Sequence, residues 1–215
     1  MKGVSLVTRA NQATTVQLAK SLQTSVCLNG RTFQICVKQT AQLTSEEYAA
    51  IWHMTETNMR VFLEKSSLGW DEVTKKQELF HPTESRFILV KYQPPDAEAG
   101  GQQQPAAGPA FAAFTVFRFE EEFNERLLYC YELQIAEPWR RYGVGRSLMT
   151  MLIDIGRHWR MQKLMLTVLK ANEGARKFYS AIGLEKDEST PDYVPEGETA
   201  EDIEECDYDI MSLML

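Results

Sequence analysis

Residues 140–146 have the composition of a binding site for an anionic ligand. They read Arg-Arg-Tyr-Gly-Val-Gly-Arg and lie between a predicted strand and a predicted helix. Glycines at alternate positions let backbone N–H groups approach a ligand closely, and a helix N-terminus adds the positive end of its dipole. The segment therefore predicts a cradle for a phosphate or pyrophosphate group. A P-loop would need Gly-Lys-Ser/Thr, and a dinucleotide-binding loop would need a third glycine where Leu148 stands.

A second motif follows at a spacing that makes the first more specific. Asn172 stands twenty-seven residues after Gly145 and begins Asn-x-x-Ala-x-x-Phe-Tyr, after a strand that is apolar on both faces. The order strand, glycine loop, helix, strand, asparagine, helix resembles the acetyl-CoA-binding half of the GNAT acetyltransferase superfamily over residues 126–184. This resemblance implies an α/β fold of the GNAT type, with a mixed, mostly antiparallel central sheet flanked by helices. For the loop alone, a glycine turn without a ligand is the simpler explanation.

Five shorter segments are similar to one branch of that superfamily, the NatD-type N-terminal (N-alpha) acetyltransferases. They are residues 57–59, 128–134, 165–168, 189–191 and 206–208, and the similarity extends from about residue 33 to residue 212. The branch acetylates the free N-terminal amine of histone H4 and histone 2A, whose shared start is Ser-Gly-Arg-Gly-Lys. The resemblance implies the same reaction here, with acetyl-CoA as cosubstrate, the two histone tails as partners, and a monomer located in the nucleus and cytoplasm.

The resemblance also assigns roles to individual residues. Glu132 is the expected general base, acting through a water molecule, with Tyr131 beside it, and Tyr179 is a candidate acid for protonating the leaving thiolate. Contacts with acetyl-CoA are expected from Leu133, Gln134, Ile135, Arg141, Tyr142, Gly143, Val144, Gly145, Arg146 and Asn172. The peptide is expected to meet Glu120, Glu122, Tyr131, Thr167, Ser189 and Tyr208, with the two glutamates pairing with its arginine.

Several of these residues also have simpler explanations. Tyr131 could pack in the core, Glu132 could point outward from its strand, and residues 120–125 could form a solvated acidic turn. Leu63 and Leu68 depart from the branch, because aromatic residues are expected there at the substrate entrance. The alternative enzyme is an acetyltransferase for lysine side chains or small amines. The alternative of another class is a non-catalytic acidic module that binds histone tails.

Composition excludes several classes of protein. Of the 215 residues, 44% are hydrophobic and 25% are charged, which is typical of a soluble globular protein. No uncharged apolar run approaches the ~18 residues that a membrane span needs, so no membrane association is expected. Four cysteines without a CxxC pair and three histidines are too scattered for a zinc site, and no metal is expected. The lack of a signal peptide at the start favours a reducing compartment.

Charge is unevenly distributed along the chain, whose net charge is −7. Residues 185–209 hold twelve acidic residues and one base, whereas the first 45 residues hold five bases and no acid. An acidic segment repels nucleic acid and attracts cationic partners, so no direct nucleic acid binding is expected. We predict a basic N-terminal extension at residues 1–28, for which a transit peptide is the alternative, and an acetyltransferase domain at residues 29–215. Within the domain, residues 94–109 are expected to form a flexible hairpin loop and residues 187–206 an acidic loop.

Hydrophobic periodicity predicts the elements that must position these residues. Thr44 and Glu47 form a capping box, which should start a long helix. Helices are expected at residues 45–66, 71–79, 144–159 and 173–182, and strands at residues 33–37, 86–93, 110–119, 127–135, 163–169, 184–186 and 208–213.

Overall fold

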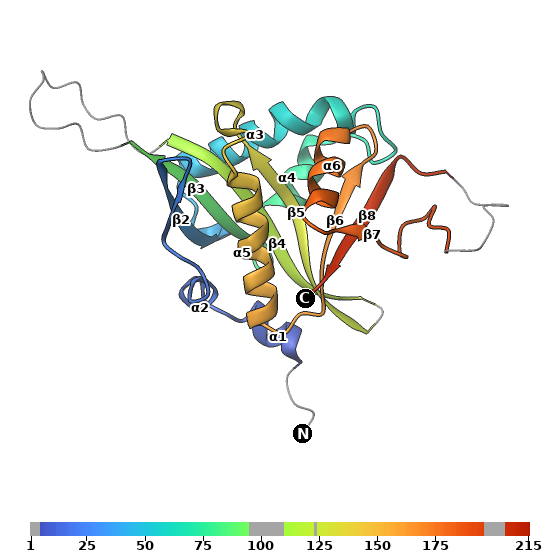
Figure 1. Cartoon of the computed structure of the whole chain (residues 1–215), viewed down its shortest axis with the longest axis horizontal. Helices are drawn as coiled ribbons and strands as arrows, with labels where there is room; N and C mark the ends of the chain where they lie inside the picture. The colour runs from blue at the N-terminus through green and yellow to red at the C-terminus, as the bar shows by residue number, and fades with distance from the viewer. Residues whose placement is uncertain (1–4, 95–109, 123, 196–204) are drawn as a thin grey trace, which may run out of the picture.

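An eight-stranded sheet forms the centre of the computed structural model, which describes residues 5–94, 110–122, 124–195 and 205–215 (Figure 1). The strand order is β1-β2-β3-β4-β5-β6-β8-β7, and neighbouring strands are antiparallel except for the parallel pair β5–β6. The strands are β1 (Ser25–Leu28), β2 (Arg31–Gln39), β3 (Arg86–Gln93), β4 (Ala110–Glu122), β5 (Glu125–Ile135), β6 (Lys163–Leu169), β7 (Glu185–Lys186) and β8 (Tyr208–Met214). The prediction of a mixed, mostly antiparallel sheet flanked by helices is confirmed.

Helices cover both faces of the sheet. In Figure 1, α5 crosses the front face with α1, α2 and α6, while α3 and α4 lie behind the sheet. The helices are α1 (Leu6–Asn11), α2 (Thr15–Ala19), α3 (Ser45–Leu63), α4 (Glu72–Leu79), α5 (Val144–His158) and α6 (Glu173–Ala181), with 3-10 turns η1 (Thr40–Gln42) and η2 (Glu137–Trp139). Among the described helices, none is long and apolar enough to cross a membrane.

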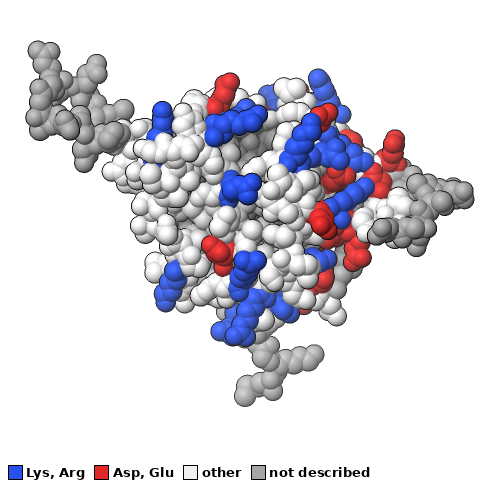
Figure 2. Space-filling view, in the orientation of Figure 1, with Lys and Arg blue, Asp and Glu red and all other residues white. Residues whose placement is uncertain are grey.

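Charged side chains divide the front face. Figure 2 shows Lys and Arg spread over the face that carries α5, whereas Asp and Glu gather towards α6, β7 and β8. At that side Lys170 and Lys186 both bind Asp192, and Arg176 lies 2.9 Å from Asp209. The start of the predicted acidic loop is therefore paired with cations of the domain.

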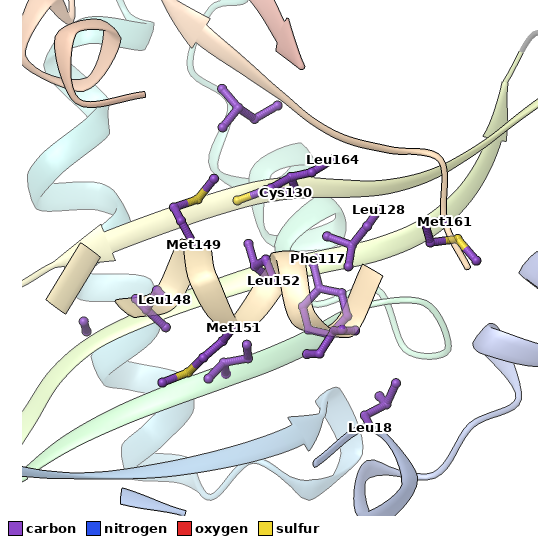
Figure 3. Packing of buried hydrophobic residues seen from close by; sticks show 14 of the residues in the cluster. Leu18, Phe117, Leu128, Cys130, Leu148, Met149, Met151, Leu152, Met161 and Leu164 are labelled. Carbon is purple, nitrogen blue, oxygen red and sulfur yellow. The ribbon is translucent and has the colours of Figure 1, made fainter. Parts of the chain in front are cut away.

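The larger of the two hydrophobic cores lies between α5 and the sheet. Figure 3 shows Leu148 and Leu152 of α5 beside Phe117 of β4 and Leu128 of β5, and all four are fully buried. The smaller core, on the opposite face, packs α3 and α4 against the sheet through Ile51, Met54, Leu79, Phe87, Leu89 and Phe114. The capping box predicted for α3 is confirmed, because Thr44 and Glu47 exchange both hydrogen bonds.

Residues 5–28 pack against the rest of the chain, although the sequence predicted no element before residue 33. Val7, Ala10 and Leu18, from α1 and α2, belong to the larger core. Asn29 and Gly30, with φ values of 50° and 75°, join β1 to β2 in a hairpin. The first strand of that hairpin lacked a sequence signal because it has four residues, none of them buried.

The β4–β5 hairpin corrects part of the expectation of a solvated acidic turn at residues 120–125. β4 continues through Glu120 to Glu122, and β5 begins at Glu125, so these residues belong to paired strands. Glu121 and Glu122 are nevertheless exposed, as expected of a solvated segment. β3 pairs with β4, so the segment between them joins neighbouring strands. The predicted flexible loop, from residue 95 onward, and residues 196–204 of the acidic loop lie outside the described residues.

Candidate active site

The central cavity opens where β5 and β6 separate. The two strands pair from Leu127 and Lys163 as far as Cys130 and Leu166, where the pairing ends. A cavity of about 500 Å³ lies at this point, and its lining includes Tyr131, Glu132, Leu133, Gln134, Thr167, Asn172, Tyr179 and Tyr208. Eight of the residues singled out from the sequence are thus brought together. The strand amides of β5 beyond Cys130 have no partner strand on this side, so they are free to polarise a carbonyl.

A bulge in β5 brings Tyr131 and Glu132 to the same face of the sheet. Val116 of β4 is opposite Glu132 and Phe117 is opposite Cys130, which leaves Tyr131 as the extra residue. Cys130 therefore faces the α5 core, whereas Tyr131 packs against the core on the α3–α4 side. Glu132 contacts α4 on that same side. Two adjacent strand residues normally point to opposite faces, so the bulge is what places Tyr131 and Glu132 on the same face of the sheet.

Glu132 is buried and held at both oxygens. Lys75 Nζ of α4 lies 2.8 Å from its Oε1, and Gln134 Nε2 donates to its Oε2 at 2.7 Å. The alternative in which Glu132 points outward from its strand is wrong, because its side chain lies inside this contact network. A buried carboxylate with charged and polar partners at the end of a cavity is suited to accept a proton.

Lys75 is a site residue that the sequence did not reveal. Its ammonium also lies 2.8 Å from the carboxylate of Glu78. Burial lowers the pKa of Lys75, but the carboxylates of Glu132 and Glu78 outweigh burial and raise that pKa above its usual value. In the sequence, Lys75 and Glu78 form an ordinary i,i+3 pair of a short polar helix, so no signal distinguished them from a solvated surface pair.

Tyr131 contacts one acidic and one basic side chain of β4. Its hydroxyl donates to Glu120 Oε1 at 2.6 Å, and Arg118 Cζ lies 4.1 Å from the centre of its ring. Burial raises the pKa of Glu120, although the hydrogen bond from Tyr131 lowers it. Burial likewise raises the pKa of Tyr131, and Glu120 raises it further. Glu120 thus reaches the cavity through Tyr131 and not directly.

Tyr179 of α6 closes the cavity from the other side. It is almost fully buried, and burial raises its pKa well above 10, with further contributions from Cys130 and Glu132. Burial also raises the pKa of the Cys130 thiol to about 12. The phenol is therefore neutral near pH 7, and its role as the acid that protonates the leaving thiolate stays a prediction.

The glycine loop has the geometry of an anion cradle. Gly143 caps α5 with a left-handed φ of 88°, Arg141 has a φ of 67°, and no side chain caps the helix. The first amides of α5 are therefore free to bind phosphate oxygens. Gly145 serves packing, because an added Cβ would lie 3.0 Å from Ile135 Cδ1 and 3.2 Å from Phe178 Cζ. These features fit the pyrophosphate of acetyl-CoA, with Val144 and Arg146 in the same first turn.

Two further contacts fix the ends of the cofactor region. Tyr142 packs beneath Arg31 of β2, whose guanidinium carbon lies 4.9 Å from the ring centre. Asn172 caps α6 by accepting from the Ala175 amide at 3.2 Å. The predicted helix start at Asn172 is confirmed, and its side-chain oxygen is already engaged.

Two of the predicted substrate residues, Glu122 and Ser189, are not in the cavity lining. Thr167 lines the cavity, and its hydroxyl is hydrogen-bonded at 2.5 Å to that of Tyr129, which joins β6 to β5. Glu122 and Ser189 line a second, acidic pocket of about 400 Å³ together with Glu125, Leu127, Lys163, Met165, Asp187 and Glu188. Ser189 Oγ donates to Asp187 at 2.7 Å.

The cavity mouth shows what replaces the aromatic residues expected there. Leu63 and Leu68 line the cavity, as does Trp70, which the sequence reasoning did not single out. Trp70 packs against Trp52 of α3 with ring centres 5.6 Å apart. Trp70 therefore adds an aromatic side chain to the part of the lining that includes Leu68. Within the described ranges, no group of three or more His, Cys, Asp or Glu side chains is arranged to hold a metal ion.

Comparison with known proteins identifies the family. The sequence model of the acetyltransferase (GNAT) family matches residues 51–184, and the chain belongs to this family. An acetyltransferase of this family takes its acetyl group from acetyl-CoA. That the separated strands and the glycine loop hold this cosubstrate stays a prediction.

Solved structures of the same fold include N-terminal acetyltransferases. Arabidopsis thaliana NAA60 in complex with a bisubstrate analogue has a TM-score of 0.56 at 11% identity, covering 85% of this chain and 99% of that chain. A. thaliana Naa50 with the bisubstrate analogue CoA-Ac-MVNAL has a TM-score of 0.53 at 16% identity, with coverages of 84% and 99%. The GNAT domain of S. lividans PAT has a TM-score of 0.57 at 11% identity, with coverages of 89% and 96%. At these identities the likeness is one of fold.

Proposed function

We propose that this acetyltransferase acts on the free N-terminal amine of histone H4 and histone 2A, as the NatD branch does. The observation that carries the proposal is the cavity at the end of the β5–β6 pairing, which is lined by both Tyr131 and Glu132. The fold likeness to NAA60 and Naa50, each solved with a bisubstrate analogue, supports a peptide substrate. The segments that resemble the NatD branch narrow the substrate to the start Ser-Gly-Arg-Gly.

Glu132 supplies the proton acceptor in the proposed reaction. An α-amine has a pKa near 8, so most of it is charged at neutral pH and must lose a proton before it attacks the thioester carbonyl. Glu132 takes that proton through water, the β5 amides near Leu133 polarise the carbonyl, and Tyr179 returns a proton to the thiolate. The cosubstrate supplies the activated acetyl group, and the first turn of α5 holds its phosphates.

Acidic side chains account for the proposed preference for arginine. Glu120 lies behind Tyr131, and Glu122 faces the neighbouring acidic pocket with Ser189. Tyr131, Thr167 and Tyr208 leave room for small first residues. In this proposal the protein works as a monomer on histone tails in the nucleus and cytoplasm, without binding nucleic acid, membrane or metal.

Turnover on matched peptides tests the function. We expect acetylation of a Ser-Gly-Arg-Gly-Lys peptide and none of the same peptide with a blocked N-terminus. Acetylation of both would make the protein a lysine acetyltransferase, and turnover of small amines alone would identify a small-amine enzyme. Binding of both peptides without turnover would make it a tail-binding module. Each of these three results overturns the proposal.

A second comparison tests the arginine contact. A charge-assisted contact is worth about 1.5–3 kcal/mol, so replacing the peptide arginine by alanine should lower kcat/KM by roughly ten- to a hundredfold. Glu122→Ala should cost a similar factor on the arginine peptide and little on the alanine peptide. Glu120→Ala is compared separately, because it also removes a partner of Tyr131. Equal losses on both peptides would show that Glu122 does not meet the arginine.

A further inference from the structure

Both carboxylate oxygens of Glu132 are engaged by side chains from different elements. Lys75 of α4 contacts Oε1 at 2.8 Å, and Gln134, two residues along β5, donates to Oε2 at 2.7 Å. Lys75 is mostly buried, and its second partner is Glu78. An ammonium held between two carboxylates in a cavity wall is costly to bury unless both partners are kept.

Hydrogen bonds connect Gln134 to Arg140, which directly precedes the glycine loop. Asn58 of α3 donates to Gln134 Oε1 at 2.9 Å, and Arg140 donates to Asn58 Oδ1 at 2.9 Å. These contacts fix the orientation of the Gln134 amide, so that its NH₂ group faces Glu132. The amide is neutral, so it orients the carboxylate without setting its charge. The charge of the site must come from Lys75.

We propose that Lys75 is a positioning residue that holds Glu132 in its carboxylate form and directs it into the cavity. The proposal rests on the proposed role of Glu132 as the base, but not on the identity of the peptide. A buried carboxylate left without a cation favours its neutral form, which cannot accept a proton. The charge of Lys75, 2.8 Å away, therefore opposes the neutral form of the Glu132 side chain.

A fixed charge explains Lys75 better than a role as a nucleophile. The carboxylates of Glu132 and Glu78 raise its pKa despite burial, so it stays an ammonium without a free electron pair. Near Glu132 lie also the carboxylate of Glu78, the thiol of Cys130 and the phenols of Tyr131 and Tyr179, and burial raises the pKa of the thiol and both phenols. The thiol and the phenols remain neutral near pH 7, and the Glu78 carboxylate has the same sign of charge as Glu132, so none of them replaces Lys75 as a counter-ion.

Lys75 also has a consequence for the substrate amine. A second cation beside Glu132 is opposed by the ammonium already present, whereas a neutral amine is not. At pH 7 only about a tenth of an α-amine with a pKa near 8 is neutral. The site therefore favours the neutral amine, whose ammonium proton passes through water to Glu132 before the bond to the acetyl carbon forms.

The experiment compares Lys75→Met, Lys75→Arg and Lys76→Met in the full chain. Lys76 is the matched control, because it is the next residue of α4 and pairs on the outside with Glu72. The first readout is a ¹³C NMR titration of glutamate side-chain carboxyls, with the Glu132 signal assigned by its loss in Glu132→Gln. The second is the pH profile of kcat/KM on the Ser-Gly-Arg-Gly-Lys peptide. Thermal unfolding checks that each variant is folded.

In Lys75→Met, the NMR midpoint of Glu132 should move up by about 1–3 pH units, as expected when an opposite charge within a few ångströms is removed. The acidic limb of kcat/KM should move with it, so the loss is large near pH 6 and small near pH 9. Lys75→Arg should keep both midpoints near those of the wild type, as should Lys76→Met. An unmoved NMR midpoint, or a loss of kcat/KM that is equal at every pH, overturns the proposal. So does an acetyl group found on Lys75 by mass spectrometry during turnover.

The two readouts separate this proposal from the proposed function. If Glu132→Gln retains full turnover, Glu132 is not the base and the proposed function fails at that point. The NMR midpoint of Glu132 in the Lys75 variants still tests the role of Lys75. If Lys75→Met does not fold, the variants Lys75→Arg and Glu78→Gln test the proposal instead. Lys75→Arg must leave the NMR midpoint of Glu132 unchanged. Glu78→Gln must leave Lys75 in place beside Glu132. A shifted midpoint in Lys75→Arg contradicts the role of its charge.

Discussion

Gly143 and Gly145 stand two residues apart in the cofactor loop and are required for different physical reasons. At Gly143 an added Cβ would meet nothing within 4 Å, but the φ of 88° is one that side-chain-bearing residues rarely adopt. At Gly145 the backbone is helical and the space is filled by Ile135 and Phe178. A substitution at the first position therefore strains the loop, whereas one at the second separates α5 from α6 and β5.

We expect Gly143→Val to raise the KM for acetyl-CoA by at least tenfold, because a β-branched residue cannot hold this φ without a cost of about 1–3 kcal/mol. The change moves the first amides of α5 away from the positions that would bind phosphate. Steady-state kinetics and calorimetric titration with acetyl-CoA measure the effect. Gly183→Val is the matched control, since Gly183 has a φ of 95° beyond α6 and an added Cβ there would meet only Leu213 within 4 Å. An unchanged affinity in a folded Gly143→Val variant would remove this loop from the site.

α3 is tied to the sheet at its first turn by one buried carboxylate. Glu47, the third residue of the capping box, binds Lys38 of β2 at 2.6 Å and Lys91 of β3 at 2.9 Å. Burial raises the pKa of Glu47, but hydrogen bonds from Lys38, the Thr44 amide and Lys91 together lower it to about 2. This anchor sets the depth of the helix that carries Asn58, and so the contact of Asn58 with Gln134.

Glu47→Gln should lower the free energy of unfolding at pH 7 by about 1–3 kcal/mol, since each unit of pKa shift corresponds to about 1.4 kcal/mol. The folded pKa lies below the unfolded value of 4.5, so this stability is present above pH 4.5 and is lost as the pH falls towards 2. Urea unfolding of wild type and variant should therefore differ most at neutral pH and converge near pH 2. Glu64→Gln, which breaks an exposed pair with Arg60 on the same helix, should change stability by less than about 1 kcal/mol.

Helices and strands with a long hydrophobic pattern or a specific capping motif could be predicted from the sequence, whereas shorter ones could not. β6 was expected at residues 163–169 and is found there, because a run that is apolar on both faces marks a buried strand. α1 and α2 have six and five residues, fewer than two turns, so no helical period can show in them. The site divides in the same way. Glu132 and Tyr131 were found by resemblance, whereas Lys75 depends on how α4 docks, which no local pattern encodes.

The N-terminal segment, α1 to the β1–β2 hairpin, contacts both the larger core and the residues next to the glycine loop. α1 and α2 pack under α5, and the β1–β2 hairpin carries Arg31 to the rings of Trp139 and Tyr142. Cation–π contacts at exposed sites are worth about 0.5–1 kcal/mol each, so the hairpin restrains the loop only modestly. The larger contribution of the segment is the burial of apolar side chains at one end of the main core.

Leu18 tests whether the first 28 residues are integral to the domain. Leu18 is fully buried, whereas Val16 on the same helix is 71% exposed. Leu18→Ala should lower the free energy of unfolding by about 2–5 kcal/mol, through lost transfer energy and the cavity left behind, and the melting temperature by about 4–20 °C. Val16→Ala should change the free energy of unfolding by less than about 0.5 kcal/mol, since surface substitutions rarely have a larger effect. Calorimetry gives both values, and turnover below the transition should be unchanged because Leu18 touches no site residue. Equal, small shifts in the two variants would instead show that residues 1–28 are an appendage whose removal the acetyltransferase domain tolerates.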